Sequence, residues 1–172
     1  MTGSASERVP GIVADTGPLQ YLVLIGEIDL LPRLFRVVAI PAVVQAEMLH
    51  PEAPDSVRSW AGAPPQWLTI APGPTKGGAD PRRRGAGERA AIALALASRA
   101  ELILMDDRAG VAAARAEGLS VIGTLGVLVR AARRGMVELE ATFTRLRGTN
   151  FRYSPELLET LLARHSERGS GS

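Results

Sequence analysis

The chain has 172 residues, enough for one domain with a sizeable core, and its 46% hydrophobic and 22% charged residues are ordinary for a globular protein. The absence of cysteine excludes disulfides, thiolate metal sites and a cysteine nucleophile. The net charge is only +2, and all but one of the 20 basic residues are arginine, which suits contact with phosphate or merely reflects a general preference for arginine.

The first half of the chain alternates short apolar runs with helical patterns. Residues 11–15 (GIVAD) predict a buried strand, and Pro18 suits the first turn of a helix that follows it. The same reading predicts further elements as far as a loop rich in Gly, Pro and charge at residues 71–86. These elements are helices at 18–26 and 27–35, a strand at 37–41, helices at 42–50 and 55–62, and a strand at 67–70.

The second half continues the alternation. It predicts a helix at 87–99, a strand at 102–105, a helix at 108–117, a strand at 119–122, and helices at 124–134, 138–147 and from Ser154 to about His165. Strands that alternate with helices predict an α/β fold, with a central parallel sheet covered by helices on both faces. We expect a flexible N-terminus over residues 1–10, a single domain over 11–165 and a flexible tail over 166–172.

No apolar run approaches the roughly 20 residues needed to cross a bilayer, and the N-terminus lacks a signal-peptide segment. We therefore expect a cytoplasmic protein without membrane contact. Only His50 and His165 offer imidazole, so any metal site would be built mainly from oxygen. Such a site favours Mg²⁺ or Mn²⁺ over zinc.

Acidic residues stand where a functional crevice is expected. Asp15 ends the first predicted strand, and Asp106 and Asp107 follow the fourth; in parallel sheets the crevice lies beyond these carboxyl ends. Glu47 and Glu88 fall on the apolar faces of their predicted helices, where a carboxylate is costly without compensation. Together these acids predict a cation site, which in turn indicates metal-assisted hydrolysis of a phosphodiester.

Each acid also has an ordinary explanation. Asp15 is a possible helix cap, Glu88 a favourable first-turn acid, and Glu47 a partner for a nearby arginine. One of Asp106 and Asp107 is expected to cap the helix that starts at residue 108 whatever the other does. These explanations account for the acids singly, but they do not explain why all of them fall near one strand-end crevice.

The order of these features resembles the PIN-domain ribonucleases, which include the VapC-type toxins of toxin–antitoxin pairs. The resemblance covers residues 11–164 and rests on six stretches: DTGPL, PAVVQAEM, GERAAIALALA, LILMDDRAG, GTLGVL at residues 123–128, and FRYS at residues 151–154. It implies a three-layer α/β/α sandwich and a metal-dependent endoribonuclease that uses Mg²⁺ or Mn²⁺. It also implies an RNA substrate and a cognate antitoxin covering the crevice, often with a basic residue in place of the metal; a homodimer is left open.

By position, the resemblance assigns the catalytic and metal-binding roles to Asp15, Glu47, Glu88 and Asp107. Met105 stands where relatives usually carry Thr in a Thr-x-Asp pattern, so Asp106 is a second candidate, as a ligand or as a partner of the ligands. Thr16, beside Asp15, is expected to orient a water bound to the metal.

Two groups of basic residues have an RNA-binding and an ordinary interpretation. Arg82, Arg83 and Arg84 would guide the RNA backbone, or would belong to a solvated loop. Arg130, Arg133 and Arg134 are expected to form a solvated face of one helix. The leucines at 157, 158, 161 and 162 are expected to pack on the domain in preference to a partner.

Two other functions compete with the nuclease. Residues 85–90 fit the G-x-G-x-x-A pattern of dinucleotide folds, although its glycines do not leave a strand directly. The second is a PIN module that binds RNA or a protein without catalysis.

Overall fold

The computed structural model of the chain describes residues 11–72 and 85–171. The expected flexible N-terminus, most of the Gly/Pro loop with Arg82, Arg83 and Arg84, and the last residue of the tail lie outside the described residues.

The described residues form one parallel sheet of five strands in the order β3-β2-β1-β4-β5. The strands are β1 (Gly11–Ala14), β2 (Val37–Pro41), β3 (Leu68–Ala71), β4 (Leu102–Leu104) and β5 (Val121–Ile122). From β1 the chain builds the sheet toward β3 and then returns to add β4 on the other side. The strand order therefore reverses between β1 and β4, which is where ligands bind in open α/β sheets.

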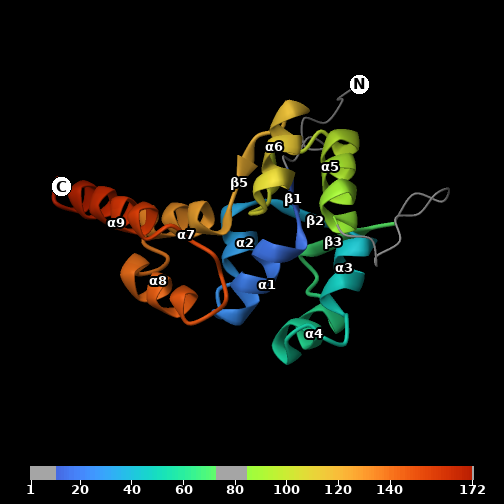
Figure 1. Cartoon of the computed structure of the whole chain (residues 1–172), viewed down its shortest axis with the longest axis horizontal. Coiled ribbons are helices and arrows are strands. Elements are labelled where there is room, and N and C mark those ends of the chain that lie inside the picture. The colour runs from blue at the N-terminus through green and yellow to red at the C-terminus, as the bar shows by residue number, and fades with distance from the viewer. Residues whose placement is uncertain (1–10, 73–84, 172) are drawn as a thin grey trace, which may run out of the picture.

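Helices cover both faces of this sheet, so the expected three-layer α/β/α fold is confirmed (Figure 1). Ile12 and Ala14 of β1 point into the larger core, while Val13 points into the smaller core on the opposite face. Alternation along a strand places its successive side chains on opposite faces in this way.

The smaller core packs under α5 (Ala86–Ser98) and α6 (Arg108–Ala116), which present mainly alanine to the sheet. The larger core packs under α1 (Thr16–Leu24), α2 (Leu30–Leu34), α7 (Thr124–Arg133) and α8 (Leu139–Arg147). The remaining helices are α3 (Ala42–Met48), α4 (Asp55–Gly62) and α9 (Pro155–Gly169). No helix in the described part of the chain is long and apolar enough to span a membrane.

Most element boundaries lie close to those expected from the sequence, with two differences. The second helix begins at Leu30 and not at 27, because Pro32 fits only the first turn of a helix and the residues before it form turns. The last helix runs on to Gly169, since no residue between His165 and Gly169 breaks it. Its start is as expected: the Ser154 side chain caps it and Pro155 occupies the first turn.

The predicted packing faces are found with small changes. Leu158 is buried and Leu161 and Leu162 are partly buried in the larger core, whereas Leu157 is exposed. Arg133 at the end of α7 and Arg134 just after it are exposed as expected, but Arg130 lies over the ring of Phe35.

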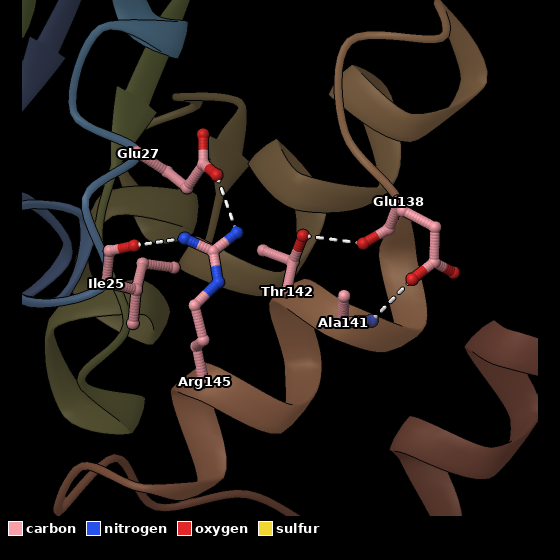
Figure 2. Close-up of polar contacts among 6 residues, drawn as sticks. All are labelled: Ile25, Glu27, Glu138, Ala141, Thr142 and Arg145. Carbon is pink, nitrogen blue, oxygen red and sulfur yellow. Dashed lines mark hydrogen bonds and ion pairs between the residues drawn. The ribbon is translucent and has the colours of Figure 1, made fainter.

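A polar junction holds α8 against the turn after α1 (Figure 2). The guanidinium of Arg145 donates hydrogen bonds to the carbonyl oxygen of Ile25 and, at 2.7 Å, to the Glu27 carboxylate. At the start of α8, the Glu138 side chain accepts a hydrogen bond from the backbone N–H of Ala141 at 2.8 Å. The junction ties the second half of the chain to the first on the larger-core side of the sheet.

Candidate functional site

A pocket of about 200 Å³ opens at the carboxyl ends of β1 and β4, where the strand order reverses. The structure brings the five acids singled out from the sequence together in its lining. The lining residues are Asp15, Thr16, Gly17, Pro18, Glu47, Gly85, Gly87, Glu88, Asp106 and Asp107.

Asp15 directly follows the central strand and is the most deeply buried acid of the pocket, with 6% of its surface exposed. Its backbone N–H donates to the Leu104 carbonyl at 2.9 Å, which fixes it beside the end of β4. Although it occupies the cap position of α1, its side chain makes no capping hydrogen bond. Helix capping therefore does not explain this acid.

Burial raises the pKa of Asp15 from 3.8 to about 7. This value already includes smaller increases caused by the negative charges of Glu88, Glu47 and Asp106, and a decrease caused by a hydrogen bond from the Thr16 backbone. Acids from four separate stretches of the chain are thus close enough to repel one another.

Glu47 reaches the pocket from α3 and is held there by two neutral donors. The Thr16 hydroxyl donates to Oε2 of Glu47, and the Gly87 backbone N–H donates to Oε1 at 3.0 Å. Among the described residues, these donors hold the acid in place of the arginine considered as its ordinary explanation. Thr16, expected to orient a water, positions Glu47 in this structure.

The approach of Gly87 to Glu47 requires glycine. A Cβ at position 87 would lie 2.5 Å from Oε2 of Glu47, closer than atoms can approach without displacement. Because the Gly87 N–H is already bonded to Glu47, and α5 does not directly follow β3, the G-x-G-x-x-A stretch does not form a dinucleotide site.

Glu88 enters the pocket from the first turn of α5, where an acid is also favoured by the helix dipole. Its carboxylate lies near the start of α6: a Cβ at Gly110 would be 3.4 Å from Cδ of Glu88. Both the functional and the ordinary interpretation of this acid therefore fit its position.

The adjacent acids after β4 have different environments. Asp107 caps α6, where its Oδ2 accepts from the Gly110 N–H at 2.9 Å, and it is exposed. Asp106 turns inward and accepts hydrogen bonds from the backbone N–H of Thr124 at 2.8 Å and from its hydroxyl at 2.5 Å. Burial raises the pKa of Asp106, and the two hydrogen bonds from Thr124 lower it. Both acids line the pocket, and which of them would bind a metal stays a prediction.

Thr124 and Gly123 are site residues whose role the sequence reading missed. Thr124 is fully buried and holds Asp106, while a Cβ at Gly123 would lie 2.7 Å from Oδ1 of Asp106. A signal was present, because these residues directly follow β5, and β5 neighbours β4 in the sheet. Residues that end adjacent parallel strands meet at one edge.

A family model described as a PIN domain (DUF3368) matches residues 11–167. This chain belongs to the PIN-domain family. No curated protein and no solved structure matches it significantly. PIN domains are generally nucleases and typically use divalent metal ions, so the chain carries a nuclease-type module.

The side chains of this PIN domain offer the ligand atoms that such an ion prefers, because five acids line the pocket. The charges that act on Asp15 are all those of acids. The geometry is not assembled for one: within residues 11–72 and 85–171, no three Asp, Glu or His side chains are arranged to hold a metal. Glu47, Asp106 and Asp107 instead use oxygens on protein N–H and O–H donors. Binding an ion would require some of these carboxylates to turn.

Proposed function

We propose that this PIN domain is a metal-dependent endoribonuclease that hydrolyses RNA phosphodiester bonds in the cytoplasm, with Mg²⁺ or Mn²⁺ as its cofactor. One observation carries the proposal: acids from distant stretches converge on a pocket at the switch point of the sheet, with Asp15 buried among them. Burying several like charges is unfavourable, so their convergence calls for a positively charged ligand.

In this proposal Asp15, Glu88 and one or both of Asp106 and Asp107 hold the ion, with Glu47 as a further ligand. The ion supplies polarisation of the phosphoryl group, activation of water and stabilisation of the leaving oxygen. The residues of the chain would position the carboxylates around that ion.

Contacts within the chain hold two of these carboxylates at the pocket, from where they would turn to bind an ion. Thr16 and Gly87 each donate a hydrogen bond to a different oxygen of the Glu47 carboxylate, and Thr124 holds Asp106. Outer contacts of this kind orient metal ligands, and their loss typically lowers metal affinity or activity by roughly 10–100-fold.

The decisive experiment compares the wild-type chain with Asp15→Asn in cleaving a mixed RNA pool with Mg²⁺ or Mn²⁺. We expect wild-type cleavage that stops in chelator, and at least about a hundredfold lower rate in Asp15→Asn, because the buried ligand is lost. Asp29→Asn is the matched control, since Asp29 is exposed and lies outside the pocket. Equal rates for wild type and Asp15→Asn would refute catalysis at this pocket.

A non-catalytic PIN module that binds RNA or a protein is the second candidate. It is favoured by the observation that no described group of three acids is arranged for a metal. RNA binding without cleavage in either metal, by the wild type and by Asp15→Asn alike, would establish it.

We also propose that the chain is the toxin of a type II toxin–antitoxin pair, from its resemblance to the VapC-type toxins. A cognate antitoxin would cover the pocket, and a basic side chain of the antitoxin would neutralise the acids there. A neighbouring reading frame whose product co-purifies with the chain and suppresses its RNA cleavage would support this; RNA cleavage unaffected by any neighbouring product would refute it.

A further inference from the structure

The segment between α8 and α9 returns to α1 (Figure 1), where two of its residues contact Tyr21. Tyr21 marks the place: it lies three and four residues after Pro18 and Gly17, which line the pocket, and so shares their side of α1. The Tyr21 hydroxyl donates to Oδ1 of Asn150 at 3.0 Å, and its ring packs edge-on against Phe151 with centroids 5.0 Å apart. These contacts fix the returning segment one helical turn from the pocket.

The next residue, Arg152, is exposed and forms no hydrogen bond or ion pair with any part of the chain that the structure describes. Its chain neighbour Phe151 packs against Tyr21, which places Arg152 near the same turn of α1. Burial raises the pKa of Tyr21, the charge of Asp106 raises it too, and the charge of Arg152 lowers it. The charges of Asp106 and Arg152 therefore both act on this phenol.

Tyr153 follows and is 38% exposed. Neither Arg152 nor Tyr153 is needed to start α9, because Ser154 caps the helix and Phe151 anchors the segment in the core. The segment that contacts Tyr21 thus carries an exposed cation and an exposed aromatic ring.

We propose that Arg152 and Tyr153 bind single-stranded RNA beside the pocket, Arg152 at a backbone phosphate and Tyr153 by stacking on a base, with Tyr21 as their positioning residue. The inference rests on the proposed function and names where its substrate is held. A pocket lined by carboxylates repels phosphate, so the strand needs a cation outside the pocket to bring it there. Arginine and aromatic rings are the side chains that hold unpaired nucleotides.

The burial of Asp15 explains why the strand is single. A phosphodiester must enter a recess whose deepest acid is 94% covered. A stiff duplex cannot bend a single phosphate inward, whereas a single strand can be splayed and its base stacked on a ring.

The test measures binding without cleavage, by fluorescence anisotropy of a labelled short single-stranded RNA in chelator across a salt series. We expect Arg152→Gln to bind roughly three- to tenfold more weakly, and its log–log salt slope to fall by about 0.7, the value for one phosphate contact on a single strand. Arg164→Gln is the matched control, because Arg164 is exposed on α9, away from the pocket. Unchanged binding by Arg152→Gln, or an equal loss in Arg164→Gln, would overturn the proposal.

A second pair of variants tests the ring. Tyr153→Phe keeps the stacking face and should bind like the wild type, while Tyr153→Ala should lose about as much affinity as Arg152→Gln. A blunt-ended RNA duplex without loops should bind weakly and respond little to any of the four variants. A duplex that binds as tightly as the single strand, with the same loss in Arg152→Gln, would contradict a single-stranded substrate.

The outcomes separate this inference from the proposed nuclease. RNA binding that depends on Arg152, in a protein that cleaves nothing with Mg²⁺ or Mn²⁺, would keep the inference and remove the nuclease. Metal-dependent cleavage whose KM is unchanged in Arg152→Gln would keep the nuclease and remove the inference.

Discussion

Around α8 two carboxylates have partners within the chain: Glu27 accepts a hydrogen bond from Arg145 at 2.7 Å, and Glu138 caps the helix (Figure 2). At the pocket, Asp15 is buried and Asp106 is partly buried, and the pKa of each is raised. In the first region the charges are paired within the chain and help to join two parts of the fold. In the second, neighbouring acids raise the pKa of Asp15, and we propose that a bound cation would balance their charge.

The difference in environment separates stability from function in this molecule. The junction carboxylates are partly in water, so their partners stabilise the fold only modestly. The pocket carboxylates include the buried Asp15, whose charge costs the fold stability that a bound cation would restore. If this comparison is right, removing a charged side chain from the junction should lower the free energy of unfolding. Removing one from the pocket should raise it when no metal is bound.

The largest effect is expected from Asp15→Asn on the pH dependence of stability in chelator. The unfolded chain releases the Asp15 proton near pH 3.8, whereas the folded chain keeps it until about pH 7. Between these values the folded state binds more protons, so the free energy of unfolding of the wild type falls as pH rises. Roughly three pH units at about 1.4 kcal/mol each give a loss of up to about 4 kcal/mol, complete above pH 7.

Asp15→Asn has no such proton. In urea unfolding, its free energy of unfolding should therefore exceed that of the wild type by an amount that grows from pH 4 to pH 7. At neutral pH it should melt higher than the wild type in chelator, yet gain little from Mg²⁺, which stabilises only a protein that binds it. Asp29→Asn should follow the wild type at every pH. If the free energy of unfolding changed with pH in the same way in the wild type and in Asp15→Asn, the proposed electrostatic difference between the two regions would be wrong.

The next effect concerns how tightly the pocket is packed around Glu47. Gly87→Ala would place a Cβ 2.5 Å from Oε2 of Glu47, so we expect a loss of about 1–3 kcal/mol and a weaker thermal response to Mg²⁺. Gly17→Ala is the matched control: this glycine lines the same pocket in the first turn of a helix, and its Cβ would meet nothing within 4 Å. It should instead stabilise by up to about 1 kcal/mol, the helix preference for alanine over glycine.

Both variants would be measured by chemical unfolding. If Gly87→Ala proved as stable as Gly17→Ala and retained the Mg²⁺ response, Glu47 would not be held by Gly87 as described.

The fold could be predicted because its signals are local. Each strand is a short apolar run, and prolines and glycines mark the limits of most helices, as Pro155 does for α9. The positions of Asp15 and Asp106 after strands were enough to expect them at one edge of the sheet. That expectation needs only the parallel arrangement, not the packing.

The partners of the carboxylates could not be predicted, because they depend on packing between distant elements. Gly87 lies 40 residues from Glu47 and meets it only because α3 packs against α5. Thr124 lies 18 residues from Asp106 and meets it through the neighbouring strand ends. These contacts decide which of the two adjacent acids turns inward. The sequence alone therefore could not decide between Asp106 and Asp107 as the inward acid.

At the junction we expect Arg145→Ala to destabilise the fold by about 1–2 kcal/mol, because a hydrogen bond to a backbone carbonyl and a partly exposed ion pair are lost together. Arg147→Ala, on the exposed surface of the same helix, should change stability by less than about 0.5 kcal/mol. Unfolding in urea at low and high salt would separate the two contributions, since salt weakens only the ion pair. Equal stability of the two variants would show that the junction does not hold α8.

The smallest effect is expected at the start of α8. Glu138→Ala removes the acceptor of the Glu140 and Ala141 backbone N–H groups and should cost about 1 kcal/mol, as the loss of a helix cap does. Glu140→Ala removes a nearby acid that interacts only with the helix dipole, so about 0.3 kcal/mol is expected. Neither change should alter Mg²⁺-dependent melting, because both residues belong to the region that balances its own charge. A lost metal response in Glu138→Ala would mean that the two regions are coupled, and that the pocket depends on the way α8 is held.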